Sequence, residues 1–189
     1  MPARAQTSNA AIVAAGRRLL EERGMDALTM REVADAVGVR TPSLYKRVRD
    51  RSDLVRLILE DVIDELTAAT DAAAASGDPA ADLRAMLAVY RSFARANPVA
   101  YQLMDAPQSA SAPGAAARSE RAAATLLRLV TDLAGPRHAL PAARTIVAWA
   151  NGFITMELAG AFRLGGDLEQ AWDFGLDRIL NAVRLENDG

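Results

Sequence analysis

The chain has 189 residues and a formal net charge of −2, with no cysteine and a single histidine, His138. This length fits one domain, or a small head on a larger body, and it suffices to bury a proper core. The absence of cysteine excludes disulfides, thiolate metal sites and a cysteine nucleophile, and one histidine excludes metal motifs that need two imidazoles. We therefore expect neither a bound metal nor a cofactor, although a metal site made of carboxylates alone is compatible with the sequence.

The charge is distributed unevenly along the chain. Residues 1–56 carry 11 basic and 7 acidic side chains, a net of +4, whereas the remaining residues carry 11 and 17, a net of −6. This asymmetry favours a basic head that meets a polyanion, although chance segregation would produce it as well. The sequence has neither a run of about 18 apolar residues nor an apolar signal core at its start, so we expect a cytoplasmic protein.

No segment alternates apolar and polar residues as a half-buried strand does. Alanine alone accounts for 41 residues, and alanine, leucine, arginine and glutamate are good helix formers. Segments with helical periodicity are separated by glycine- and proline-rich stretches, of which 107–114 is the best candidate for a mobile loop. We predict an all-α fold of about nine helices, with a head at 1–52 and a helical body at 53–189.

The first 55 residues predict three short helices. Gly24 and Gly38 end the first two, and the third runs from Thr41 to about Arg47. Thr29, with Glu32 three residues later, forms a capping box, and Thr41 is expected to cap the third helix. Such short helices need to pack against one another, and two of them joined by a tight glycine turn form a helix-turn-helix.

Leu44 and Val48 lie four residues apart, so both are expected to face inward from the third helix. Small, polar or cationic side chains then face outward, at the end of a helix that could enter the major groove of DNA. Residues 40–51 hold five cations against one anion, although a charged run is also compatible with a plain solvated face. The candidate DNA contacts are Arg31, Arg40, Thr41, Pro42, Ser43, Tyr45, Lys46, Arg47 and Arg51.

The stretches LTMREVADAVGV (28–39) and PSLYKRVRDRSDL (42–54) resemble the DNA-binding head of the TetR family, and the resemblance covers about residues 8–55. It implies a homodimeric transcriptional regulator whose helical body binds a small effector. Most members of this family are repressors. By position, it places Thr41, Pro42, Ser43 and Lys46 near base edges, Tyr45, Arg47 and Arg51 on phosphates, and Arg31 at the groove or backbone. Many members have histidine or a second aromatic residue after the tyrosine, so either Lys46 or Arg47 could read a base.

A long helix from about Arg51 joins head and body, with Leu54, Ile58 and Val62 along one face. The family resemblance implies that this helix shifts to change the spacing of the two heads, but an ordinary connecting helix would have the same sequence. Residues 141–164 are the most apolar segment, and the last helix is expected at about 168–185. We predict a four-helix homodimer interface through residues 141–185.

Polar residues in the apolar segment 141–164 exclude a membrane span, because Asn151, Glu157 and Arg163 would each be costly in lipid. The run from Trp149 to Gly152 loosely resembles the mark of a TetR C-terminal subgroup defined by a Trp-His-Gly motif. An effector pocket with an apolar lining and a few polar groups is expected, although such residues more often form a core. Its candidate residues are Met86, Tyr90, Phe93, Tyr101, Met104, Trp149, Asn151, Phe153, Met156 and Glu157.

These observations favour a sequence-specific DNA-binding regulator, and the resemblance implies a repressor that a small apolar effector releases. A constitutive DNA-binding protein without an effector fits the same residues. A helical enzyme or carrier is disfavoured, since the sequence has no glycine-rich phosphate loop and no nucleophile next to a recognisable base.

Overall fold

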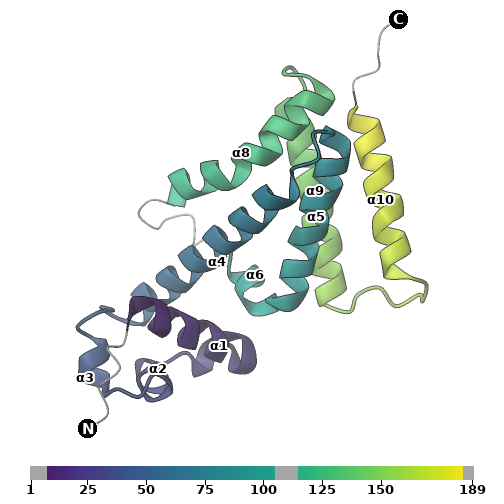
Figure 1. The fold of residues 1–189 in the computed structure, drawn as a ribbon. Coiled ribbons are helices and arrows are strands. Elements are labelled where there is room, and N and C mark those ends of the chain that lie inside the picture. The colour runs from purple at the N-terminus through teal and green to yellow at the C-terminus, as the bar shows by residue number, and fades with distance from the viewer. Residues whose placement is uncertain (1–7, 105–114, 185–189) are drawn as a thin grey trace, which may run out of the picture. The chain divides into compact units, whose positions relative to one another are not determined.

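The computed structural model describes residues 8–104 and 115–184. Within these residues the chain forms helices and no strand, which confirms the all-α prediction (Figure 1). The helices are α1 (Asn9–Ala27), α2 (Met30–Ala36), α3 (Thr41–Leu44), α4 (Arg51–Ala73), α5 (Pro79–Ala96), α6 (Pro98–Met104), α8 (Ala115–Ala134), α9 (Ala139–Leu158) and α10 (Leu168–Val183). The loop predicted at 107–114 lies outside the described residues.

The described residues belong to two compact units. The first unit contains α1, α2, α3, α6 and α4 as far as Glu65, and the second contains the rest of α4 with α5, α8, α9 and α10. The sequence predicts a head at 1–52, whereas the first compact unit continues along α4 to Glu65 and includes α6. None of the described helices is long and apolar enough to cross a membrane.

Capping side chains and a glycine define the first helices as expected. The Thr29 hydroxyl accepts a hydrogen bond from the Glu32 backbone N–H at 3.1 Å, which confirms the predicted cap of α2. The Glu32 carboxylate does not complete the capping box in the usual way but accepts from Arg23 at 2.8 Å. Gly24 interrupts α1 with a φ of +75°, a conformation that glycine adopts without steric cost, and a further turn follows it.

Two close contacts hold α1 inside the first unit. A Cβ at Gly16 would lie 2.8 Å from the Ile58 Cδ1, so the missing side chain lets α1 approach α4. The Glu21 carboxylate accepts the backbone N–H groups of Val99 and Ala100, at 3.1 and 2.8 Å, in the first turn of α6. Because the first N–H groups of a helix have no partner within it, Glu21 attaches α6 to α1.

The second unit is organised around α9, which packs against α5 and α10 (Figure 1). Its Trp149 and Phe153 rings meet Trp172 of α10, with centroid distances of 4.8 and 5.2 Å. Gly175 of α10 lies directly against Trp149, because a Cβ there would come within 2.5 Å of the indole ring. Trp149, Phe153 and Trp172 therefore form an aromatic cluster between α9 and α10, and these two helices approach closely at a glycine.

Candidate nucleic-acid interface

The helix-turn-helix lies in α2, α3 and the tight turn between them. Gly38 adopts a φ of +71° in that turn, and the Val39 N–H donates back to the Ala34 carbonyl at 3.0 Å. This left-handed conformation strongly favours glycine, because a Cβ would be strained there. The predicted turn between the two helices is confirmed.

The third helix differs from the prediction at both ends. Arg40, with an extended backbone, is the N-cap and makes no capping bond through its side chain, so the predicted cap at Thr41 is wrong. The Arg40 carbonyl accepts from the Ser43 N–H at 2.8 Å, which makes Thr41 the first helical residue. The α-helix ends at Leu44, and Tyr45 to Arg47 form a tighter turn in which the Arg47 N–H donates to the Leu44 carbonyl.

The orientation of α3 follows the predicted inward pair. Leu44 and Val48 are both about 1 % exposed and face the core of the first unit. On the other side, Thr41 is partly exposed and its neighbours are exposed: Pro42, Ser43, Tyr45, Lys46 and Arg47. The structure thus leaves the small, polar and cationic face of this segment open to a ligand.

The exposed cations around α3 give the face a positive charge. Arg40, Lys46 and Arg47 are exposed and have no ion-pair partner among residues 8–104 and 115–184. Arg31 on α2 is exposed as well and lies 3.9 Å from Asp35, a distance at which a surface ion pair contributes little. These cations can therefore reorient toward phosphates or base edges.

Asp53 fixes the turn that carries the chain from α3 into α4. Its carboxylate accepts from the Arg49 backbone N–H at 3.0 Å and from the Arg56 guanidinium at 2.7 Å. These bonds lower the pKa of Asp53 to about 2, from an ordinary value of 3.8. The Asp53 N–H in turn donates to the Asp50 carboxylate at 2.8 Å. These bonds connect the turn after α3 to the first turns of α4.

Sequence reasoning missed Asp53, although a signal for it exists. Two acidic residues three positions apart, Asp50 and Asp53, precede the apolar run of α4, as in a capping box. Arg51, which the sequence assigned to phosphate, donates to the carbonyls of Leu28 and Met25. Its first role in the structure is thus to connect α4 with the end of α1.

The predicted effector-pocket residues are distributed over both units. Tyr101 and Met104 belong to α6 of the first unit, where Tyr101 is buried. The others belong to α5 and α9 of the second unit: Met86, Tyr90, Phe93, Trp149, Asn151, Phe153, Met156 and Glu157. Among these, Met86 and Phe93 are buried, Trp149 and Phe153 are half-buried in the aromatic cluster with Trp172, and Met156 is exposed.

The two polar residues in this set do have partners, as burial requires. Asn151 accepts from the Tyr90 hydroxyl at 2.8 Å. Glu157 accepts two bonds of 2.8 Å from Arg91, a buried cation on α5 that also pairs with Glu169. The guanidinium holds the pKa of Glu157 below its ordinary value.

Sequence reasoning did not single out Arg91. The signal was its position on the apolar face of α5, four residues after Leu87, where helical periodicity calls for a hydrophobic side chain. The guanidinium lies over the Phe153 and Trp172 rings, 5.4 and 5.0 Å from their centroids. Arg91 is thus an internal anchor for three helices.

A packed helix-turn-helix with an exposed cationic face defines the class of DNA-binding transcriptional regulators. Residues 12–58 match the family model described as "Bacterial regulatory proteins, tetR family", and residues 83–179 match "Tetracyclin repressor-like, C-terminal domain". The chain therefore belongs to the TetR family and is a DNA-binding transcriptional regulator, as its sequence predicted.

Individual proteins are similar to this chain in sequence or in fold. The "Uncharacterized HTH-type transcriptional regulator Rv0681" of Mycobacterium tuberculosis is 27% identical over 158 residues, which are 82% of this chain and 72% of that protein. A Rhodococcus sp. RHA1 protein of unknown function has a TM-score of 0.80 at 26% identity, covering 93% of this chain and 94% of its own. A TetR variant from Acinetobacter baumannii AYE, in complex with minocycline, has a TM-score of 0.68 at 20% identity, covering 95% and 99% of the two chains.

Proposed function

We propose that this regulator reads duplex DNA with the exposed face of α3 and the turn after it. The observation that carries the proposal is the burial of Leu44 and Val48, which directs the opposite side chains away from the protein. Thr41, Pro42, Ser43 and Lys46 then lie near base edges, and either Lys46 or Arg47 reads a base. Tyr45, Arg47 and Arg40 hold phosphates, and Arg31 reaches the groove or backbone from α2.

Arg51 has a smaller part in the proposed interface. Its guanidinium already donates to two backbone carbonyls, those of Met25 and Leu28. A phosphate contact would have to use its remaining N–H groups. We therefore expect substitution of Arg51 to act through the stability of the first unit as well as through DNA affinity.

The test is binding of a fluorescent duplex from the adjoining intergenic DNA over a range of salt concentrations. Arg47→Ala should weaken binding and reduce the slope of log K against log salt by about 1, because one phosphate contact is lost. Arg137→Ala removes an exposed arginine of the second unit and is the matched control. A variant with unchanged affinity and slope would contradict the interface, and loss of folding would show that Arg47 does not face outward.

We infer further that the regulator works as a homodimer through residues 141–185. The outward side of α9 carries small exposed residues, and a Cβ at Gly152 would meet no atom of the same chain. A second helix could therefore approach closely there, as in a four-helix interface. Gly152→Arg should convert a dimer into a monomer in sedimentation at micromolar concentration, whereas Ala88→Arg on the exposed side of α5 should not. A wild-type monomer at that concentration would refute the dimer.

We propose that the protein represses transcription and that a small apolar effector releases it from DNA. It would act in the cytoplasm of a bacterium and catalyse no reaction. Support comes from the family, and from the apolar and aromatic residues of α5 and α9 that could line a pocket. The test is release of the labelled duplex by a panel of apolar compounds. If none of the compounds changes the DNA affinity at concentrations at which each is dissolved, the protein is a constitutive DNA-binding regulator without an effector.

A further inference from the structure

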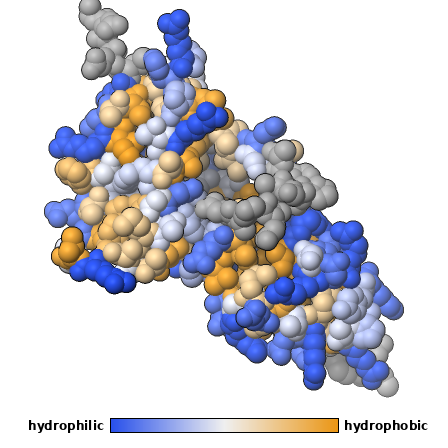
Figure 2. All heavy atoms as spheres, turned by 180° about the vertical axis from the view of Figure 1, so that it is seen from behind, coloured by the Kyte–Doolittle hydropathy of each residue, from blue (hydrophilic) through white to orange (hydrophobic). Residues whose placement is uncertain are grey.

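The connection between α9 and α10 presents the most exposed large apolar side chain in the described part of the chain. Leu164 is fully exposed, and Phe174 and Met156 near it are exposed to 63% and 45%. Single exposed hydrophobic residues are common, but a group of them marks an interaction surface. Figure 2 shows apolar and polar side chains interspersed over the face of the second unit that is in view.

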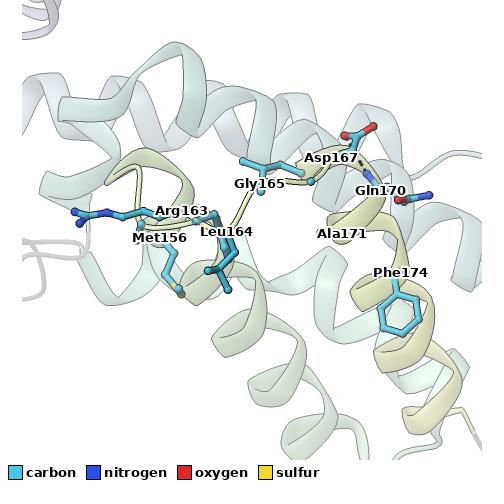
Figure 3. Close-up of a pocket in the computed structure, with 12 residues that line it drawn as sticks. Met156, Arg163, Leu164, Gly165, Asp167, Gln170, Ala171 and Phe174 are labelled. Carbon is cyan, nitrogen blue, oxygen red and sulfur yellow. Dashed lines mark hydrogen bonds between the residues drawn. The ribbon is translucent and has the colours of Figure 1, made fainter.

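These side chains surround an open cavity of about 660 Å³. Figure 3 shows Leu164 and Met156 at one side of it and Phe174 of α10 at the other. Phe162 also lines the cavity, and its ring packs against Phe153 of the aromatic cluster with a centroid distance of 4.9 Å. The cavity thus has an apolar wall that is backed by the aromatic cluster.

The segment that carries Leu164 projects between two fixed ends. At one end, the Ala161 N–H donates to the Met156 carbonyl at 2.9 Å, and at the other, Asp167 caps α10 by accepting from the Glu169 N–H at 2.8 Å. Between them, Gly165 has a φ of +77°, and a Cβ on it would meet no atom within 4 Å. The space around Gly165 is therefore open, and the neighbouring Leu164 is exposed.

We propose that two copies of this chain exchange this arm, so that Leu164 of each copy occupies the cavity of the other. The inference rests on the proposed homodimer and adds a contact that neither copy can complete alone. A two-fold interface uses the same patch on both subunits, and this patch supplies both a projecting apolar side chain and a cavity for it.

The charges beside the arm favour a second copy over another occupant. Arg163 and Asp167 flank Leu164 with opposite signs, and both are exposed. A two-fold axis that passes between these two residues would bring the cation of one copy to the anion of the other, so the patch can be complementary to itself. The cavity also lies between α9 and α10, the helices of the proposed dimer interface, so the arm extends that interface.

The first test is the dissociation constant of the full-length dimer, measured by sedimentation. Leu164→Asp removes one buried leucine contact from each half of the interface, so the dissociation constant should rise roughly a hundredfold. Ala88→Asp is the control, because Ala88 is exposed on α5, outside the helices of the proposed interface, and does not line the cavity. Its dissociation constant should stay within about threefold of the wild type.

The second test uses the absence of native cysteine. One tagged copy carries Leu164→Cys and a differently tagged copy carries Ala171→Cys in the cavity wall, and a short bis-maleimide should join the two. A copy with Ser119→Cys, an exposed position on α8, should not be joined to Leu164→Cys. A stable dimer with no such cross-link and an unchanged dissociation constant in Leu164→Asp would overturn the arm exchange alone. A monomeric wild type would overturn the dimer as well.

Discussion

Replacing Arg91 by methionine should destabilise the second unit far more than the same replacement at Arg95. Both arginines lie on α5 and pair with Glu169, but they differ in burial. Arg91 is 4% exposed and holds Glu157, itself 11% exposed, through two bonds of 2.8 Å. Arg95 and Glu169 also meet at 2.8 Å, yet they are 53% and 63% exposed.

The burial of each pair determines the expected magnitude. Removing one partner of a buried pair leaves an uncompensated charge and lowers the free energy of unfolding by about 3–5 kcal/mol. Loss of an exposed pair lowers it by less than about 1 kcal/mol, because water screens both charges. Methionine retains an apolar stem against the Phe153 and Trp172 rings, so Arg91→Met mainly removes the charge.

The assay is urea unfolding at one fixed protein concentration, followed by circular dichroism, since dimerisation makes stability depend on concentration. A pH series adds a second readout. Arg91 lowers the pKa of Glu157, so in the wild type this pair contributes stability at neutral pH that is lost as pH falls through the lowered pKa. Without Arg91, we expect burial to raise the pKa of Glu157. As pH falls, Glu157 of the variant then takes up a proton, and the energetic penalty of its buried, unpaired charge disappears.

The gap in unfolding free energy between wild type and Arg91→Met should therefore narrow from pH 7 toward about pH 4. The internal anchor assigned to Arg91 is refuted if Arg91→Met and Arg95→Met lower the free energy of unfolding equally at pH 7. It is also refuted if the difference between wild type and Arg91→Met does not change with pH.

Three further substitutions test the contacts that hold each unit together. Asp53→Asn should lower the free energy of unfolding by about 1–2 kcal/mol at neutral pH. The pKa of Asp53 falls from 3.8 to about 2 on folding, so the difference between wild type and variant should persist above about pH 5 and vanish below about pH 2. Urea titrations over this pH range measure it. Gly175→Ala should lower stability by about 1–3 kcal/mol and change the tryptophan emission, since the new Cβ displaces the Trp149 ring; a stabilised variant would contradict this packing. Glu21→Ala should cost about 1–3 kcal/mol in urea unfolding because two N–H groups of α6 lose their acceptor, whereas Glu22→Ala, at the exposed next position, should change little.

The sequence by itself determined the local architecture of the head. The Thr29 cap, the turn at Gly38 and the inward pair of Leu44 and Val48 all act over a few residues, so spacing alone specified them. The outward face of α3 followed directly, because a helix that buries one side must expose the other. The end of α3 did not follow, because a single helical turn depends on its neighbours more than on propensity.

Only the tertiary structure decided which distant side chains meet. Arg91 and Glu157 are 66 positions apart, and Glu21 lies 78 positions before the N–H of Val99 that it binds. Periodicity identifies the helix face on which each residue lies, but it does not identify the helix that packs against that face. The membership of α6 in the first unit and the internal anchor at Arg91 therefore emerge only when the helices pack, since burial makes each polar group find a partner.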